Sequence, residues 1–452
     1  MNLAKRFLYL AFSVKTGIVI AIILSFSMAV GTFIENDFGI ETALSIVYKS
    51  KWFEILWVLF ILNLTGGILY YRLWKKPYIL LIHASFIIIF LGAVLTRYAG
   101  YEGTIHLREG EVKDYILSYD PYLQFKIKAE GEVVNYQKKI FISALGGNYF
   151  SKSFNIKGER LDIKLVDFIP VVDIDLVEKT GGMSIVLLKI KKKGEDFKRY
   201  ILKDQGSLKL GKIRLYFNEK PSEKDPYIHI YSKDGNFYIG SKYPFLVSDK
   251  KEGTKKMTGY LIFEKEKLYA VGGVLISLEN MILSGDLIVK PVFKSIRGDD
   301  DLSSLVFKIN YRGDERYMYL LGRGLSYKGI TEKIKIDNVE IEGVWGSKEI
   351  KLPFYLYLKD FVLKRYPGSD KASSYESHVV LIDEKEGVEV PYVIYMNNPL
   401  KYKGYRIFQT SYDKDEKGSV LSVNYDPGTM PTYTGYAVLF LGLVLNLLKR
   451  RI

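Results

Sequence analysis

Four long apolar stretches constrain this 452-residue chain more than any other feature of its sequence. A helix needs roughly 20 apolar residues to cross the hydrocarbon core of a bilayer, and only helices or closed barrels satisfy their backbone polar groups there. The predicted spans run from about 16 to 34, 52 to 71, 77 to 98 and 433 to 448, and the last can extend back through Met430. We therefore expect an integral, multi-pass membrane protein.

Positive charges near the ends of the predicted spans indicate the orientation. With four spans, three basic clusters fall on one side of the membrane, and by the positive-inside rule that side is the cytoplasm. These clusters comprise Lys5, Arg6, Lys15, Arg72, Lys75, Lys76, Lys449, Arg450 and Arg451. We expect a protein of the cell (inner) membrane with both termini cytoplasmic and the region from about 99 to 431 on the extracytoplasmic side.

That long middle region contains many short segments in which apolar and polar residues alternate. Examples are LQFKIKA (Leu123 to Ala129) and GDLIVKPVF (Gly285 to Phe293), and clusters of Gly, Asp, Asn and Lys separate such segments. Period-two alternation between turn residues predicts antiparallel β-sheet. The predicted fold class is a membrane protein with four transmembrane α-helices, three N-terminal and one C-terminal, plus a large all-β extracytoplasmic domain of β-sandwich-like modules.

A weak internal similarity raises the question of duplication within this domain. LDIKLVDFIP (Leu161 to Pro170) resembles LYLKDFVLKRYP (Leu356 to Pro367), and SLKLGKIRLYF (Ser207 to Phe217) resembles PLKYKGYRIF (Pro399 to Phe408). SLKLGKIRLYF begins roughly 40 residues after the start of LDIKLVDFIP, and PLKYKGYRIF begins at a similar distance after the start of LYLKDFVLKRYP. Two related modules separated by an insertion are one interpretation, and chance similarity between β-rich segments is the other.

Composition excludes several kinds of chemistry. The chain has no cysteine, so disulfides, thiolate metal sites and thiol redox chemistry are excluded for the chain acting alone. The net charge of +14 is explained by orientation and contact with the lipid bilayer, and no nucleic-acid partner is predicted. The sequence contains no phosphate-binding loop, nucleophile elbow or histidine pair at i, i+4, so no catalytic residue is predicted.

The four histidines can be considered one by one. His83 lies inside the third predicted span, about two turns from its cytoplasmic end, where an ionisable residue is costly and usually faces the bundle interior or a cavity. It is either an axial haem ligand or proton-relay group, or a polar residue that bonds a neighbouring helix. His106 is interpreted as a solvated residue at the membrane surface, and His229 and His378 as ordinary strand residues.

Four segments resemble the ResB family (Ccs1 in plastids), the System II cytochrome c biogenesis proteins. They are GTFIEND (Gly31 to Asp37), SKWFEILWVLFILNL, IHASFIIIFLGAVLTRYAGYEGTIHLREGE and NNPLKYKGYRIFQTSYDKDEKGSVLSVNYDPGTMPTYTGY. The predicted topology agrees with that family. The resemblance covers both ends of the chain, whereas the middle, about 120 to 350, matches only in being β-rich. GTFIEND departs from the pattern, because relatives often carry a polar or Pro-Gln ending there.

This resemblance implies a subunit of the System II cytochrome c synthetase complex that is not an enzyme on its own. The implied partners are a CcsA/ResC-type haem-handling membrane protein and apocytochrome c. Together they bring haem b across the membrane and present it, with reduced iron, for thioether attachment. In fused members of the family, a histidine of the third span pairs with a partner histidine as axial haem ligands, and this position matches His83. The resemblance therefore implies that His83 binds iron, through haem only.

Two other classes of function remain as alternatives. A membrane-anchored sensor or adhesin with a β-rich ectodomain would usually need one or two spans, with no histidine inside the membrane. A transporter would be expected to show broken-helix pairs or repeated spans, which this sequence lacks.

Overall fold

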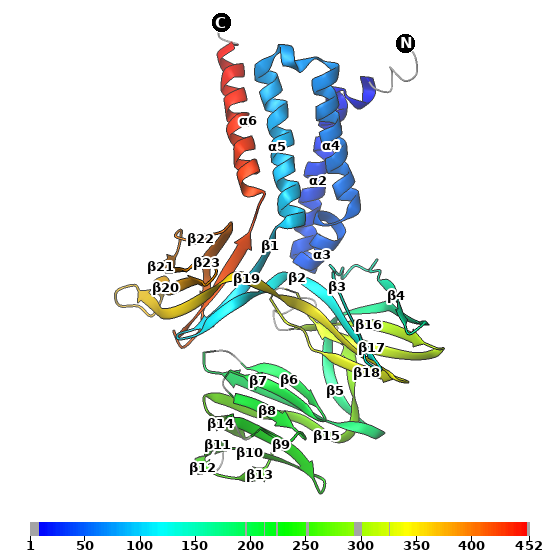
Figure 1. Cartoon of the computed structure of the whole chain (residues 1–452), viewed down its shortest axis with the longest axis vertical. Helices are drawn as coiled ribbons and strands as arrows, with labels where there is room; N and C mark the ends of the chain where they lie inside the picture. The colour runs from blue at the N-terminus through cyan, green and yellow to red at the C-terminus, as the bar shows by residue number, and fades with distance from the viewer. Residues whose placement is uncertain are drawn as a thin grey trace.

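The chain folds into a bundle of long helices and a β domain that lie end to end (Figure 1). The computed structural model describes residues 9–194, 197–211, 213–222, 225–249, 253–292, 301–324 and 326–449. Within these ranges, four helices are long and apolar enough to cross a membrane, which confirms the predicted set of three N-terminal spans and one C-terminal span. They are α2 (Val14–Phe38), α4 (Lys51–Tyr70), α5 (Pro77–Ala99) and α6 (Thr429–Lys449).

Local sequence signals set the helix ends. The Ser13 hydroxyl caps α2 by accepting a hydrogen bond from the Thr16 amide at 3.1 Å. Helix α2 continues through GTFIEND, farther than predicted, and ends where Gly39 adopts a φ of 82° that suits glycine. Pro77 begins α5, where its missing N–H has no partner to lose. The short connecting helices are α3 (Ile40–Ala43), η1 (Leu44–Tyr48) and η2 (Leu73–Lys75).

The basic residues of the bundle gather at one end. The start of α2, the turn between α4 and α5 and the end of α6 all lie at the end of the bundle away from the β domain (Figure 1). The basic residues described there are Lys15, Arg72, Lys75, Lys76 and Lys449, whereas Lys5, Arg6, Arg450 and Arg451 lie outside the described residues. The described members of the three predicted clusters therefore share one end, and which side of the membrane it faces stays a prediction.

Helices α5 and α6 pack closely because α6 carries glycine at the contact. A Cβ atom at Gly435 would lie only 3.0 Å from the amide nitrogen of Ile89 and 3.1 Å from the carbonyl oxygen of Ser85. One at Gly442 would lie 3.0 Å from the amide nitrogen of Ile82. Small residues allow such close approach between membrane helices. The face of α5 that touches α6 is thereby fixed.

Among the described residues, the strands form three sheets. The first has ten strands, in the order β21-β20-β19-β2-β1-β24-β23-β22 with β3 and β18 attached, and the second has nine, in the order β12-β11-β14-β15-β5-β16-β17 with β4 and β6 attached. The third has five, in the order β13-β10-β9-β8-β7, and contains the one parallel pair described, β8 with β9.

The bounds of the strands are β1 Tyr101–Arg108, β2 Val112–Ala129, β3 Glu132–Lys139, β4 Ser151–Ile156, β5 Glu159–Lys192, β6 Lys198–Lys203, β7 Gly206–Leu210, β8 Ile213–Phe217, β9 Tyr227–Lys233, β10 Asn236–Ser241, β11 Phe245–Asp249, β12 Gly253–Met257, β13 Tyr260–Ile262, β14 Leu268–Val271, β15 Val274–Pro291, β16 Leu302–Tyr311, β17 Asp314–Gly322, β18 Glu332–Ile336, β19 Val339–Arg365, β20 Ala372–Asp383, β21 Val388–Tyr395, β22 Leu400–Tyr402, β23 Tyr405–Tyr412 and β24 Gly418–Tyr425.

Three main apolar cores hold the β domain together. The first lies between the first and second sheets and includes Phe125 and Phe307. The second lies between the second and third sheets and includes Ile230 and Ile276. The third is formed within the first sheet, where β1, β19 and β23 contribute to one cluster that includes Ile407. Paired sheets with buried facing sides confirm the prediction of β-sandwich-like modules.

Long strands connect these cores. Strand β5 contributes Leu161 and Ile163 to the first core and Leu188 and Ile190 to the second. The segments of the predicted internal similarity form comparable elements, since β5 and β19 are both long strands and β7–β8 and β22–β23 are both hairpins. Duplication and chance similarity both stay open as interpretations.

The helix pair α5–α6 continues directly into a pair of strands. Strand β1 begins two residues after α5 ends, β24 ends just before α6 begins, and Tyr101 pairs with Tyr425 at the junction (Figure 1). The rings of these two tyrosines stack with centroids 5.2 Å apart, and the Tyr101 hydroxyl lies 2.5 Å from that of Tyr405. Helix α5 and the first sheet are therefore joined by a packed, hydrogen-bonded junction.

The turn formed by Asp426, Pro427 and Gly428 fixes the start of α6. One carboxylate oxygen of Asp426 accepts hydrogen bonds from the Gly428 amide at 2.9 Å and from the Thr96 hydroxyl of α5 at 2.6 Å. The other accepts from the Thr429 hydroxyl at 3.0 Å. One aspartate thus caps α6 and ties it to the end of α5.

Candidate functional site

His83 lies on α5 with one ring nitrogen occupied by its own helix. Its Nδ1 is 2.9 Å from the backbone carbonyl oxygen of Ile79, one turn earlier. A carbonyl can only accept, so Nδ1 carries the proton in the neutral imidazole and Nε2 carries the lone pair. Within the described part of the chain, Nε2 has no hydrogen-bond partner, and the side chain is half-buried. This is the tautomer that a metal-binding imidazole needs.

The face of α5 that carries His83 is turned away from α6. Seven residues make about two turns, so His83, Phe90 and Arg97 lie along one face, on the side of α5 roughly opposite its glycine contact with α6. Phe90 stacks on Trp57 of α4, with ring centroids 6.3 Å apart and planes inclined by 26°. The imidazole therefore lies on the same face of α5 as the aromatic contact with α4.

A polar cluster closes this face at the end nearest the β domain. The Nε and Nη2 groups of Arg97 donate to one oxygen of Glu54 at 2.9 and 2.5 Å, and Nη1 donates to the carbonyl of Tyr48 at 2.7 Å. The hydroxyl of Tyr98 and the ammonium group of Lys51 also reach the Glu54 carboxylate. The structure thus pairs Glu54 of α4 with a cation of α5.

The other histidines lie in the β domain, and none is brought near His83. His106 on β1 places Nε2 2.9 and 3.0 Å from the two oxygens of Asp413, so the prediction that it is simply solvated is wrong. His229 on β9 lies 2.8 Å from the Tyr260 hydroxyl through Nδ1. His378 lies on β20 with its nearest acidic oxygen, of Glu376, 3.7 Å away. Both of these lie on strands, as predicted.

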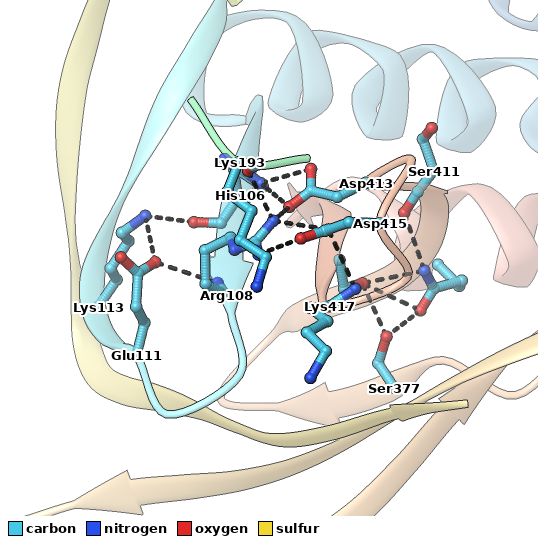
Figure 2. A network of polar contacts seen from close by, with 12 residues as sticks. His106, Arg108, Glu111, Lys113, Lys193, Ser377, Ser411, Asp413, Asp415 and Lys417 are labelled. Carbon is cyan, nitrogen blue, oxygen red and sulfur yellow. Dashed lines mark hydrogen bonds and ion pairs between the residues drawn. The ribbon is translucent and has the colours of Figure 1, made fainter. Parts of the chain in front are cut away.

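His106 belongs to a polar network centred on Arg108, which the sequence does not predict (Figure 2). The Arg108 guanidinium donates to Asp413 at 2.6 Å and to both oxygens of Asp415 at 2.9 and 2.6 Å. It also donates to the carbonyl of Lys193 at 3.0 Å, just beyond the end of β5. The network therefore ties the turn after β5 to the turn between β23 and β24.

The network predicts a dependence of stability on pH. Burial alone would raise the pKa of Asp413, but the hydrogen bonds and charges of His106 and Arg108 outweigh it and hold that pKa below its usual value. The hydrogen bonds from Arg108 likewise lower the pKa of Asp415. A carboxylate with a depressed folded-state pKa contributes stability that is complete above its unfolded pKa and is lost as pH falls through the folded value.

We therefore expect the melting temperature to fall as pH drops below about 4, the ordinary carboxylate range. The Asp415→Asn variant should already be less stable at pH 7 and should lose less on acidification. Thermal melts of the detergent-purified chain between pH 7 and 3 measure this. Parallel curves for the two proteins would show that Asp415 does not contribute.

Parts of the chain are similar to a known protein family and to a known protein. A family model described as the ResB-like family matches residues 320–420. Protein NrfI of Wolinella succinogenes is 31% identical over 427 residues, which are 94% of this chain and 33% of that protein. The chain is thus similar to the ResB-like family over residues 320–420 and to NrfI over most of its own length. It spans about a third of the length of NrfI.

The ResB-like match runs from the end of β17 to the start of β24. It therefore covers much of the first sheet, including Asp413 and Asp415, the two acidic partners of Arg108. The segment leads directly into β24 and α6.

The donor groups in the described part of the chain determine whether it could hold haem. No group of three or more His, Asp or Glu side chains suited to a metal ion occurs in the ranges that the structure describes. Imidazole is a common protein ligand of haem iron, so one histidine with a bare Nε2 could supply one ligand if haem were bound. Metal-binding histidines usually donate their other ring N–H to a group that orients the ring, and the Ile79 carbonyl accepts such a bond from Nδ1.

Proposed function

We propose that this ResB-like chain is a non-catalytic subunit of a System II cytochrome c synthetase complex that handles haem b as cargo. His83 provides one axial ligand to the haem iron, and a CcsA/ResC-type partner provides the other. The β domain lies on the extracytoplasmic side, with both termini in the cytoplasm. On the extracytoplasmic side, the complex presents haem to apocytochrome c for covalent attachment.

The observation that carries this proposal is the Nε2 lone pair of a half-buried imidazole inside a membrane helix. An unpartnered polar group at this depth is costly, so a ligand for it is expected. The aromatic pair Trp57 and Phe90 on the same side of α5 provides an apolar neighbour suited to a flat macrocycle.

Arg97 has a separate role in this scheme. It lies 14 residues along α5 from His83, which corresponds to about 21 Å of helix, farther than the propionates of a haem on His83 could reach. Its pairing with Glu54 supports a role in fixing α5 against α4 instead. Propionate contacts are therefore expected from the partner subunit.

The visible absorption spectrum of the purified complex tests the proposal. We expect the chain co-purified with its CcsA/ResC-type partner to show a Soret band and the sharp α-band of low-spin reduced haem. The chain purified alone should retain less haem, because one axial ligand is missing. A colourless complex that contains both subunits would favour the alternative of a membrane-anchored sensor or adhesin.

A further inference from the structure

Three lysines converge where the helix bundle meets the first sheet. Lys49 follows η1 immediately before α4, Lys139 ends β3, and Lys348 lies at a bulge of β19. The ammonium group of Lys348 lies 4.3 Å from the ring centroid of Tyr122, the residue that pairs directly with Lys139. The residues come from distant parts of the sequence, so the fold assembles the cluster, named here the junction lysine cluster.

The cluster has too little negative charge of its own. Asp120 lies 2.5 Å from the ammonium group of Lys139 and is thereby engaged. Among the described residues, no carboxylate contacts the ammonium groups of Lys49 and Lys348, which lie instead against the rings of Phe141 and Tyr122. Glu54, an acid at the same end of the bundle, is already paired with Arg97 and Lys51.

Burial makes this arrangement unfavourable without an anion. Lys49 and Lys348 are both half-buried. Burial lowers the pKa of each. At Lys49 the charge of Asp120 opposes this, with a smaller contribution from Glu102, while Lys139 and Arg97 lower the pKa further; at Lys348 the charge of Lys139 adds to the effect of burial. Like charges held together away from water repel one another, and a bound anion would relieve that repulsion.

The position of the cluster indicates where the anion comes from. Lys49 precedes the first residue of a membrane-spanning helix by only two positions. Trp52 and Tyr98, both exposed, lie at the same end of the bundle and have the amphipathic rings that occupy the headgroup level of a bilayer. Lysines at this level attract the headgroups of anionic lipids electrostatically.

We propose that Lys49, Lys139 and Lys348 bind the headgroup phosphate of an anionic phospholipid in the leaflet that faces the β domain. The bound lipid fixes the β domain against the end of the bundle. This inference does not depend on haem binding, and its failure would leave the proposed function untouched.

Lipid titration of the full-length protein in detergent tests the site. Native mass spectrometry with short-chain phosphatidylglycerol should show one tightly retained lipid. The double variant Lys139→Gln/Lys348→Gln should bind it about thirtyfold more weakly, at about a tenfold loss per 1.4 kcal/mol and about 1 kcal/mol per lysine. The matched control is Lys126→Gln/Lys335→Gln, which removes two exposed lysines elsewhere on the first sheet and should bind like the wild type.

Two further arms separate the sources of phosphate. Phosphatidylglycerol should raise the melting temperature of the wild type more than phosphatidylcholine does, and inorganic phosphate at the same concentration should have little effect. Equal binding by the wild type and the double variant would overturn the proposal, as would full stabilisation by inorganic phosphate alone. Melts in phosphatidylcholine, where both should agree, verify that the variant is folded.

Discussion

Replacing His83 with alanine should remove most of the haem that co-purifies with the complex. Its Nε2 is the one imidazole donor that the described membrane helices offer, so the iron would lose the axial ligand from this chain. Even changes to residues that only orient a metal ligand cost about 10- to 100-fold in affinity, and loss of the ligand itself should cost at least as much. The pyridine haemochrome assay measures haem per complex, and holocytochrome c yield should fall with it.

Added imidazole distinguishes ligation from a structural role of His83. A small imidazole can fill the space left by the truncated side chain and restore part of the haem content and yield. It cannot replace a packing contact. The matched control is His378→Ala, which removes a β-domain imidazole and should keep full haem content. Unchanged haem in His83→Ala, or a loss that imidazole does not restore, would argue against a ligand role.

Replacing Arg108 with alanine should destabilise the β domain by about 2–4 kcal/mol. Asp413 is only 7% exposed and would be left without its guanidinium partner, and breaking a buried pair in this way is more costly than losing a surface pair. Arg108→Lys should recover only part of the loss, because an ammonium group cannot reproduce the paired contacts to Asp415. Thermal melts of the full-length chain measure both changes.

The same substitution should release the turn after β5, which Arg108 holds through the carbonyl of Lys193. Limited proteolysis should therefore show new cleavage close to Gly194, since locally opened segments are cut first. The control is Arg160→Ala, whose side chain is 74% exposed and pairs with Asp162, so its effect should be at most about 1 kcal/mol. Equal losses for the two variants would mean that the Arg108 network has no special role.

The architecture could be predicted because its signals are local. Span length, the basic clusters and strand alternation each depend on neighbouring residues, and the four helices and all-β domain agree with them. The association of the sheets could not be predicted in the same way. Strand β1 pairs with β24, more than 300 residues away, and neither segment contains a sequence signal that identifies its partner strand.

The site shows the same division. The sequence predicts that His83 lies within a span. It does not predict the side-chain rotamer that places Nδ1 against the Ile79 carbonyl and leaves Nε2 without a partner. The doublet Asp413 and Asp415 in a turn is a visible signal of concentrated charge, yet its partner Arg108 lies on a distant strand. The contact of His106 with Asp413 joins residues that are more than 300 positions apart in the sequence, so the residues around His106 do not predict it.

The most direct test of the account is to ask whether a nitrogen of this chain binds the iron. The chain is labelled with ¹⁵N-histidine, with His106, His229 and His378 changed to glutamine, and assembled with an unlabelled CcsA/ResC-type partner. Pulsed electron paramagnetic resonance of the oxidised low-spin haem should then show one strongly coupled ¹⁵N nucleus. A haem-loaded complex whose coupled nitrogens are all ¹⁴N would contradict ligation by His83.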